Sequence, residues 1–217
     1  MLRTGCLVCL AFSAWGQAIS FDSAKPGSLP PGWVVAMTHE GESPKWEIVA
    51  DPSAPSKPNV IAQTSAGNTS GRFPLAIYEK ALVANGSVIV SFKAVSGERD
   101  QAAGIVWRYK DRDNYYVVRA NALEDNLVLY KVEGGKRISL EPKGTPSRTY
   151  GVKHKVPKQA WSTMRVDFDG PRFNVFLDGA KVMEVEDNTF TTPGKTGLWT
   201  KADSVTYFDD FKIQKRR

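Results

Sequence analysis

The 217-residue chain contains very little cysteine and histidine, and these two shortages exclude several kinds of protein. Its only cysteines are Cys6 and Cys9, so the rest of the chain has no disulfide and must be stabilised by an apolar core or by bound ions. Its two histidines, His39 and His154, lie far apart in predicted loops without a metal-ligand pattern around them. A catalytic zinc site is therefore not expected.

Several sequence motifs are also missing. There is no nucleophile elbow, phosphate-binding loop or dinucleotide fingerprint. No helical period persists for a full helix, and no apolar run is long enough to span a membrane. The net charge of +6 is scattered, apart from Lys215-Arg216-Arg217, so we do not expect nucleic acid to be a partner.

We expect residues 1–18 to be a secretory signal peptide. The chain starts with the positive Arg3, continues with the apolar run Cys6–Phe12, and then offers small residues for cleavage after Gly16 or Ala18. Such a segment is too short to cross a membrane as a stable span. The mature protein is accordingly expected to be secreted or periplasmic.

The stretch from Gly104 to Val132 predicts three consecutive strands. They are expected at Gly104–Tyr109, Tyr115–Leu123 and Leu127–Val132, because β-branched and aromatic residues dominate each run. The short breaks between them carry the Asp and Asn residues that favour turns.

The middle strand of this stretch has two different faces, because side chains alternate along a strand. One face is apolar and consists of Tyr116, Val118, Ala120 and Ala122. The other is mixed and consists of Tyr115, Val117, Arg119 and Asn121. An apolar face suits a protein core, and the mixed face suits the floor of a binding groove.

A second patterned block, Trp161–Asp187, predicts two hairpins. The strands are expected at Thr163–Phe168, Phe173–Leu177 and Ala180–Glu186, with turns at Asp169-Gly170-Pro171 and Asp178-Gly179. Further strands are expected at Trp33–Met37, Lys45–Ala50, Asn59–Thr64, Leu75–Glu79, Ser87–Val95, Lys136–Leu140, Gly197–Lys201 and Thr206–Ile213. Residues 19–217 are therefore predicted to form one all-β domain, a two-sheet antiparallel β-sandwich of the jelly-roll type.

Three segments resemble the concanavalin A-like lectin/glucanase superfamily, and in particular its laminin-G-like and keto-disaccharide-hydrolase-type branches. They are GIVWRYKDRDNYYVVRANALEDNLVLYKVEGGKR, WSTMRVDFDGPRFNVFLDGAKVMEVED and GKTGLWTKADSVTYFDDFKI. The resemblance implies a concanavalin A-like jelly roll and a glycan or polysaccharide as partner. Its keto-disaccharide branch implies cleavage of oxidised sugars.

The acidic residues do not repeat the pattern of the glucanases in this superfamily. Those enzymes use a Glu-x-Asp-x-x-Glu strand, whereas Glu184–Asp187 and Glu124-Asp125 are spaced differently. We interpret Glu184 and Glu186 as the solvent side of an amphipathic strand. Whether the protein is an enzyme is left open. Carbohydrate binding is the favoured function, and the alternatives are a glycoside hydrolase or lyase and a non-catalytic module that binds a protein or cell-envelope component.

The residues expected to contact a sugar combine aromatic rings with charged and amide groups. Rings cover the apolar faces of sugars, and charged groups bind their hydroxyls. The predicted set is Arg108, Tyr115, Arg119, Asn121, Glu124, Trp199, Lys201 and Asp203. Arg119 is expected either to pair internally, with Glu124 or Asp203, or to contact the ligand. We also expect Arg119 and Trp199 to share one open sheet face.

A structural metal is the last expectation from the sequence. No cofactor is required, but Asp22 near the start and Asp209 in the final strand offer carboxylate oxygens for a calcium ion, which backbone carbonyls would complete. The oligomeric state is left open.

Overall fold

A computed structural model describes residues 15–67 and 69–216, and within these ranges it contains strands and no helix. No described segment is therefore a helix able to span a membrane. The strands are β1 (Trp15–Ile19), β2 (Trp33–Thr38), β3 (Trp46–Ala50), β4 (Asn59–Gln63), β5 (Phe73–Val83), β6 (Gly86–Ser96), β7 (Ala102–Asp111), β8 (Asn114–Asn121), β9 (Asn126–Glu133), β10 (Lys136–Ser139), β11 (Val152–Lys153), β12 (Trp161–Asp169), β13 (Arg172–Leu177), β14 (Ala180–Glu186), β15 (Gly194–Trp199) and β16 (Val205–Lys215). The all-β prediction is confirmed.

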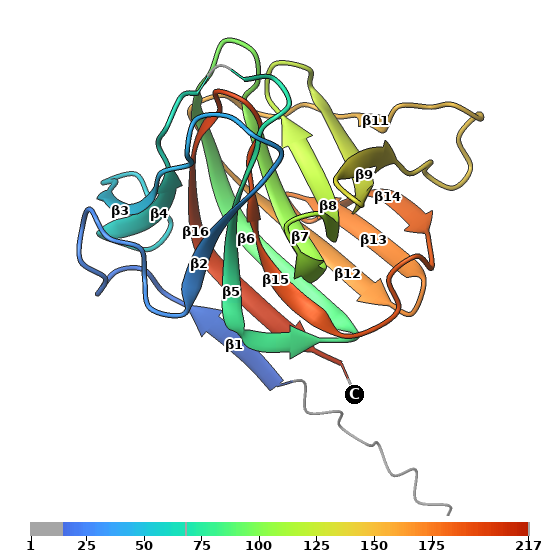
Figure 1. Cartoon of the computed structure of the whole chain (residues 1–217), viewed down its shortest axis with the longest axis horizontal. Coiled ribbons are helices and arrows are strands. Elements are labelled where there is room, and N and C mark those ends of the chain that lie inside the picture. Colours follow the sequence, from blue (N-terminus) through green and yellow to red (C-terminus); the bar gives the residue numbers. More distant parts are fainter. Residues whose placement is uncertain (1–14, 68, 217) are drawn as a thin grey trace, which may run out of the picture.

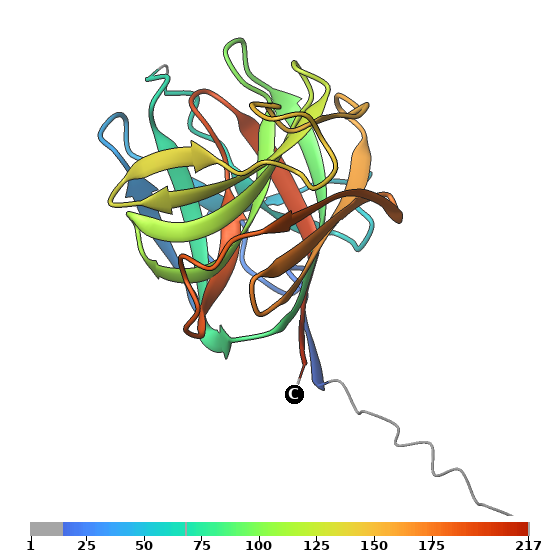
Figure 2. The ribbon, with the colours of Figure 1, turned by 90° about the vertical axis from the view of Figure 1, so that its right-hand side faces the viewer.

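The strands form two eight-stranded antiparallel sheets that pack face to face (Figures 1 and 2). Sheet A has the order β14-β13-β12-β6-β16-β4-β3, with β1 paired to β16. Sheet B has the order β10-β9-β8-β7-β15-β5-β2, with β11 paired to β9. The predicted two-sheet sandwich of jelly-roll type is therefore confirmed.

The core lies between the sheets and is rich in aromatic side chains. Trp107 of β7 has no exposed surface and stacks on Tyr116 of β8, with ring centroids 5.5 Å apart. From sheet A, Phe173 meets the same indole edge-on at 5.2 Å. Large rings that bury this much apolar area are a main stabilising term in such a core.

The predicted meander is present as β7, β8 and β9, with boundaries shifted by at most a few residues. The two faces of β8 are as predicted. The inner cluster between the sheets contains Tyr116, Val118, Ala120 and Ala122. Tyr115 and Val117 belong instead to a second cluster on the outer side of sheet B. The period-two pattern alone thus assigned these side chains correctly.

The hairpins of the second block are also confirmed. β12 pairs with β13, and β13 with β14. Asp178 and Gly179 between β13 and β14 both have positive φ, 48° and 83°, which is the backbone that an Asp-Gly turn supplies. Gly134 and Gly135 form a comparable turn between β9 and β10, with φ of 55° and 79°.

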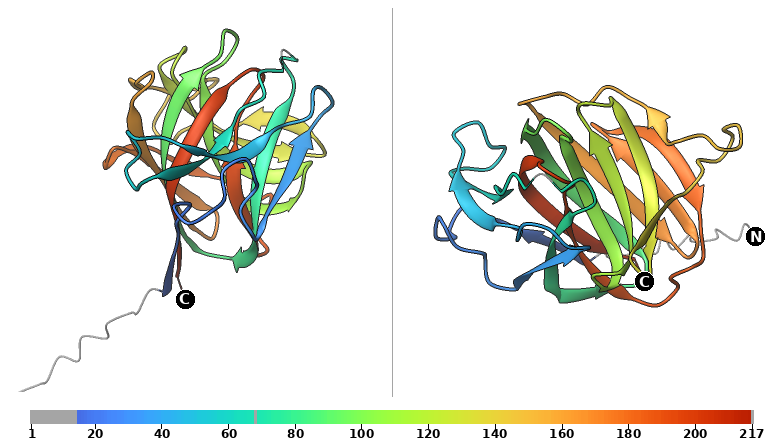
Figure 3. Two further views of the ribbon diagram at one scale, coloured as in Figure 1. Left: turned by 90° about the vertical axis from the view of Figure 1, so that its left-hand side faces the viewer. Right: turned by 45° about the horizontal axis from the view of Figure 1, so that its top comes forward.

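The structure differs from the sequence expectation at the N-terminus. Residues 1–14 of the expected signal peptide lie outside the described residues. Residues 15–18, however, belong to β1, which pairs with the end of β16 and lies beside it in Figures 1 and 3. The Gln17 side-chain amide also donates to the Tyr78 hydroxyl at 2.7 Å. The cleavage position stays a prediction, and cleavage after Gly16 would keep this contact.

Arg108 is part of the fold's framework, in contrast to its predicted role in binding sugar. It sits in an irregular stretch of β7 with a φ of 48°, and its residue is 2% exposed. Its guanidinium donates to the backbone carbonyls of Phe190 at 2.7 Å, Gly170 at 2.7 Å and Ala84 at 3.2 Å. The irregularity turns the side chain toward these loops, so it is not available to a ligand on the outer face.

We predict that Arg108→Met destabilises the domain, because three carbonyls lose their donor. Leaving buried polar groups unsatisfied should cost about 3 kcal/mol, which corresponds to a fall in Tm of roughly 6–12 °C. The control is Arg172→Met, whose side chain is 71% exposed and pairs only with Glu186, and it should cost about 0.5 kcal/mol or less. Thermal unfolding of both variants checks this, and equal Tm values for the two would contradict it.

Candidate functional site

The outer face of sheet B carries its own apolar cluster, which we call the trough. Its members are Phe73, Leu75, Ile77, Ala102, Val106, Tyr115, Val117, Val128, Tyr130, Val132 and Trp199. Arg137 of the edge strand β10 contacts the rings of Phe73 on β5 and Trp199 on β15, although several strands separate them in the sheet order. Sheet B must therefore curl strongly, so that its edge folds back over the outer face.

Arg119 and Trp199 share this face, as predicted. Both are cross-strand partners of Gly104, one on each side of β7. A Cβ at Gly104 would lie only 3.1 Å from the Trp199 Cβ and 3.1 Å from a Val117 methyl group. Glycine thus makes room here for the close approach of these side chains, since a Cβ would force its neighbours to move by a few tenths of an ångström.

The face is not open at Trp199, which corrects the sequence expectation. Trp199 and Tyr115 both have 0% exposure, because the curled edge of the sheet covers them. The Tyr115 hydroxyl lies 2.7 Å from the Thr38 hydroxyl, and burial raises the pKa of Tyr115. These two rings form the floor of the trough and are not positioned to meet a ligand directly.

Arg119 pairs with Glu124, one of its two expected partners. Its guanidinium donates to the two Glu124 carboxylate oxygens at 2.7 and 3.3 Å, and to the Asn126 side-chain oxygen at 2.7 Å. The rings of Tyr130 and Tyr150 lie over the same guanidinium, each with its centroid 5.8 Å away. The charge of a buried cation is thereby paired at one end of the trough.

Two further strand ends extend this polar group. The Asn121 amide nitrogen donates to Asp100 at 2.6 Å and to Glu124 at 3.1 Å. Lys201 donates to the other oxygen of Asp100. We call this set the Glu124 cluster: Asp100, Arg119, Asn121, Glu124, Asn126 and Lys201. Asp100 and Asn126 were missed by the sequence reasoning, because turn positions carry no pattern that separates a site residue from a turn former.

Asp203, also in the predicted set, does not point into the cluster. Its carboxylate accepts from the backbone N–H groups of Glu98 at 2.7 Å, Arg99 at 3.0 Å and Asp100 at 3.0 Å. Burial alone would raise the pKa of Asp203, but these three donors lower it overall. Asp203 therefore holds the turn that carries Asp100.

Glu124 is the member of the cluster that a ligand can reach most easily. Its side chain is 39% exposed, whereas those of Arg119 and Asp100 are 1% and 3% exposed, and that of Lys201 is 18% exposed. Beside it stands Tyr150, which is 51% exposed and whose hydroxyl contacts that of Tyr130. The arrangement is a rigidly oriented carboxylate next to a half-exposed ring.

The two predicted metal ligands also meet in the structure. The Ser56 hydroxyl lies 3.0 Å from Asp22 Oδ2 and 3.2 Å from Asp209 Oδ1. One hydroxyl proton can serve only one of these carboxylates at a time. Asp209 is fully buried, and desolvation raises its pKa. A hard cation would offset this cost, and carboxylate and hydroxyl oxygens are ligands that calcium accepts.

Comparison with known proteins identifies the family. The family model of the 3-keto-alpha-glucoside-1,2-lyase-like domain matches residues 23–214. The chain belongs to this family. The resemblance to the keto-disaccharide-hydrolase-type branch is thereby confirmed. A search of curated proteins finds no match.

Solved structures support the fold of this lyase-like domain. The carbohydrate binding module CBM66 from Bacillus subtilis is similar with a TM-score of 0.61 and 19% identity, over 83% of this chain and 94% of that one. The Crh5 transglycosylase in complex with NAG has a TM-score of 0.60 and 15% identity, over 93% of this chain and 84% of that one. The cellulose induced protein Cip1 has a TM-score of 0.57 and 15% identity, over 93% of this chain and 98% of that one. At these identities the likeness shows the fold alone.

The acid–base chemistry open to the lyase-like domain follows from its carboxylates. Asp100 and Glu124 accept from the same Asn121 nitrogen, so they lie side by side and do not face each other across a groove. Glycoside hydrolysis by the usual route needs two carboxyl groups that flank the bond. Since Asp100 is buried, this cluster offers one accessible carboxylate.

The Glu124 carboxylate should also stabilise the lyase-like domain in a pH-dependent way. Burial alone would raise its pKa, but the hydrogen bond and charge of Arg119 lower it below the ordinary 4.5. A carboxyl group with a lowered pKa contributes stability above its unfolded value, and this is lost as the pH falls through the folded value.

We therefore predict that Glu124→Gln is less stable than the wild type at neutral pH and that the two converge below about pH 4. Glu133→Gln, a change at a 52% exposed carboxylate on β9, should keep the wild-type pH dependence. The free energy of unfolding in urea, measured between about pH 7 and pH 3, checks this. Parallel curves for the wild type and Glu124→Gln would refute it.

We also predict that calcium raises the Tm of the lyase-like domain. An ion that binds only the folded state contributes about 2.7 kcal/mol at a hundred times its Kd. Asp22→Asn should remove the shift, and Asp169→Asn, at a 62% exposed carboxylate, should retain it. Among the described residues, no three His, Cys, Asp or Glu side chains are placed so that they could hold a metal ion together. The Ser56 hydroxyl and backbone carbonyls would therefore have to contribute to the calcium site. An unchanged Tm with calcium and with chelator would remove the idea.

Proposed function

We propose that this protein is an exported carbohydrate-binding domain whose glycan contacts the Glu124 cluster and Tyr150. One observation carries the proposal: an exposed carboxylate is held in one orientation by the fully buried Arg119 and by two asparagines. Arg119, Asn121 and Asn126 already donate to both oxygens of this carboxylate, so it can present its charge to a sugar hydroxyl without first losing conformational freedom. Such preorganisation lowers the entropic cost of binding.

The groups around Glu124 supply the other half of sugar recognition. Sugars present apolar ring faces as well as hydroxyls, and aromatic rings cover those faces. Tyr150 offers an exposed ring with a polar tip beside the carboxylate. Lys201, whose side chain is 18% exposed, offers donors at the same end of the trough. The site is thus small, mixed in chemistry and built on strand ends, as ligand sites often are.

The comparisons agree with a carbohydrate ligand at a coarse level. The family is described by a reaction on a glucoside, and the similar structures include a carbohydrate binding module and a transglycosylase that was solved with NAG. The expected signal peptide favours a secreted or periplasmic location. These points support the proposal and leave the sugar open.

A second function, elimination at a 3-keto sugar, is favoured by the family and by the single accessible carboxylate. In a 3-keto glucoside the C2 proton lies next to the ketone. Glu124 would take that proton, the C2–H electron pair would form the C1–C2 double bond, and the C1–O bond would break, with its electron pair staying on the leaving oxygen, which takes a proton from water. Such a step needs one base, whereas hydrolysis needs a second carboxyl group.

We predict that Glu124→Gln weakens glycan binding roughly tenfold or more, because a charge-assisted hydrogen bond typically contributes about 1.5–3 kcal/mol. Glu133→Gln should bind as the wild type does. The experiment is a broad glycan screen of the mature protein, followed by titration of each hit with both variants at neutral pH, where both must be folded by circular dichroism.

Wild-type affinity in a folded Glu124→Gln protein would exclude the proposed site. The elimination reaction is tested separately with a 3-keto glucoside. Product release that is abolished by Glu124→Gln and kept by Glu133→Gln would make the enzyme function the principal one.

A further inference from the structure

Arg137 lies over the aromatic floor of the trough, away from the Glu124 cluster. Its cross-strand partner is Val132, a trough residue, so its side chain stands on the outer face of sheet B. Its guanidinium carbon is 4.4 Å from the ring centroid of Tyr130, 4.8 Å from that of Phe73 and 6.0 Å from that of Trp199. Three rings therefore hold one cation in place.

The charge of Arg137 has no carboxylate partner within residues 15–67 and 69–216. Its Nη1 atom is buried and has no hydrogen-bond partner there. Arg119 differs, because Glu124 neutralises it, and Arg108 differs, because backbone carbonyls surround it. A partly desolvated cation without an anion favours the binding of one.

A groove beside Arg137 gives a ligand access to it. The groove encloses about 670 Å³, within the range of about 300–1,000 Å³ that is typical of small-molecule sites. It is lined by His39, Glu40, Phe73, Arg112, Asp113, Gly134, Gly135, Lys136 and Arg137. Three cationic side chains thus face two acidic ones, and Asp113 is already paired with Arg112 at 3.4 Å. The groove is therefore biased toward an anion.

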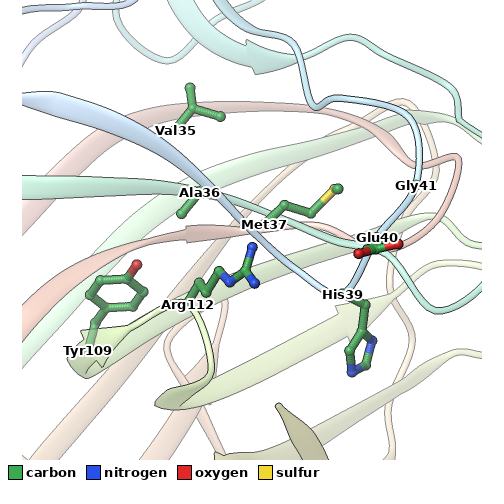
Figure 4. Close-up of a pocket in the computed structure, with 8 residues that line it drawn as sticks. All are labelled: Val35, Ala36, Met37, His39, Glu40, Gly41, Tyr109 and Arg112. Atoms are coloured by element: carbon green, nitrogen blue, oxygen red, sulfur yellow. The ribbon is translucent and has the colours of Figure 1, made fainter. Parts of the chain in front are cut away.

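A neighbouring hollow continues this groove toward β2. It shares His39, Glu40 and Arg112 with the groove, and adds Met37 and Tyr109 among its lining residues. In the view of Figure 4, the Arg112 side chain lies between those of Tyr109 and His39. The two hollows together give a ligand room beyond the one group that contacts Arg137.

His39 fixes the two walls of the groove relative to each other. Its Nδ1 lies 2.7 Å from the Gly71 carbonyl oxygen, just before β5, and its Nε2 lies 2.8 Å from the Gly135 carbonyl oxygen in the β9–β10 turn. A ring with one N–H donates to one of these carbonyl oxygens at a time, and its contact with both keeps the turn that precedes Arg137 close to the opposite side of the trough. The guanidinium is held in position before any ligand arrives.

We propose that this groove binds a sugar that carries a carboxylate, such as a uronic acid residue, with the carboxylate on Arg137. A planar guanidinium matches a planar carboxylate, and since Nη1 is buried, the two parallel donors to the carboxylate oxygens are the N–H groups of Nε and Nη2. The sugar ring lies in the groove along Phe73, and Lys136 adds to the local positive potential. The inference deepens the proposed carbohydrate function, since Tyr130 contacts both Arg137 and Arg119 and so joins this groove to the Glu124 cluster.

The test compares methyl glucuronide with methyl glucoside and with the uncharged methyl ester of the glucuronide. Isothermal titration of the wild type should show the glucuronide binding at least tenfold more tightly than either neutral sugar. Raising the salt concentration should weaken the glucuronide alone, because salt screens the ion pair. Equal affinities of the three sugars, or no binding of any, would overturn the proposal. Tighter binding of glucose 6-sulfate than of the glucuronide would also overturn it in favour of a sulfate site.

A variant pair places the effect at Arg137. Arg137→Met keeps an unbranched side chain on the three rings and removes the donors, so the preference for the glucuronide should disappear. The matched control is Arg165→Met, because Arg165 of β12 also stacks on a ring, Phe176 at 3.8 Å, but lies on sheet A. It should keep the preference. A preference that survives in a folded Arg137→Met protein would contradict the assignment.

The same titrations separate this inference from the proposed function. If Glu124→Gln weakens all three sugars while the wild type shows no preference for the carboxylate, the carbohydrate function stands and the Arg137 site fails. If Arg137→Met unfolds, the wild type still tests the site. Its relative affinity for the glucuronide and the methyl ester, and the effect of salt on each, show whether the groove prefers a carboxylate.

Discussion

The curl of sheet B is the constraint on which the rest of this structure depends. It brings Arg137 of the edge strand onto rings from β5 and β15, and it buries the outer face as well as the inner one. β8 is accordingly buried at seven of its eight positions. Gly104 favours this geometry, because a Cβ there would lie only 3.1 Å from Trp199 and from Val117. The aromatic floor therefore stabilises the domain, and polar groups at the strand ends are left for a ligand.

Arg108, Arg119 and Arg137 show three different solutions to one physical problem, the cost of a desolvated cation. Arg108 is surrounded by backbone carbonyls, which fixes the loops at one end of the sandwich. Arg119 is neutralised by Glu124 and orients it. Arg137 is contacted by aromatic rings and, among the described residues, by no carboxylate. The contacts of Arg108 therefore stabilise the fold, and those of Arg119 orient a carboxylate. The charge of Arg137 can still be paired by an anion that binds from solvent.

The Glu124 cluster lies where several turns converge at one end of sheet B. The β8–β9 turn contributes Glu124, with the positive φ of Asp125, 47°, making the reversal tight. Asp100 comes from the β6–β7 connection and Lys201 from the residues after β15. Turns supported by a rigid sheet can vary in sequence without disturbing the core, which is why ligand sites are often found there. A single accessible carboxylate in this position suits binding or elimination better than hydrolysis through two carboxyl groups.

The sequence by itself determined the strands, their inner and outer faces and the sandwich, because alternation and Asp-Gly turns are local signals. It also placed Arg119, Asn121 and Trp199 on one face. Only the tertiary structure decided that Trp199 is covered, that Arg108 points elsewhere, and that Glu124 is the partner of Arg119. It alone brought in Asp100, Asn126 and Arg137. The physical reason is that strand alternation fixes the side of the sheet a residue occupies, whereas the curl of the sheet and the contacts between distant turns fix what that residue meets.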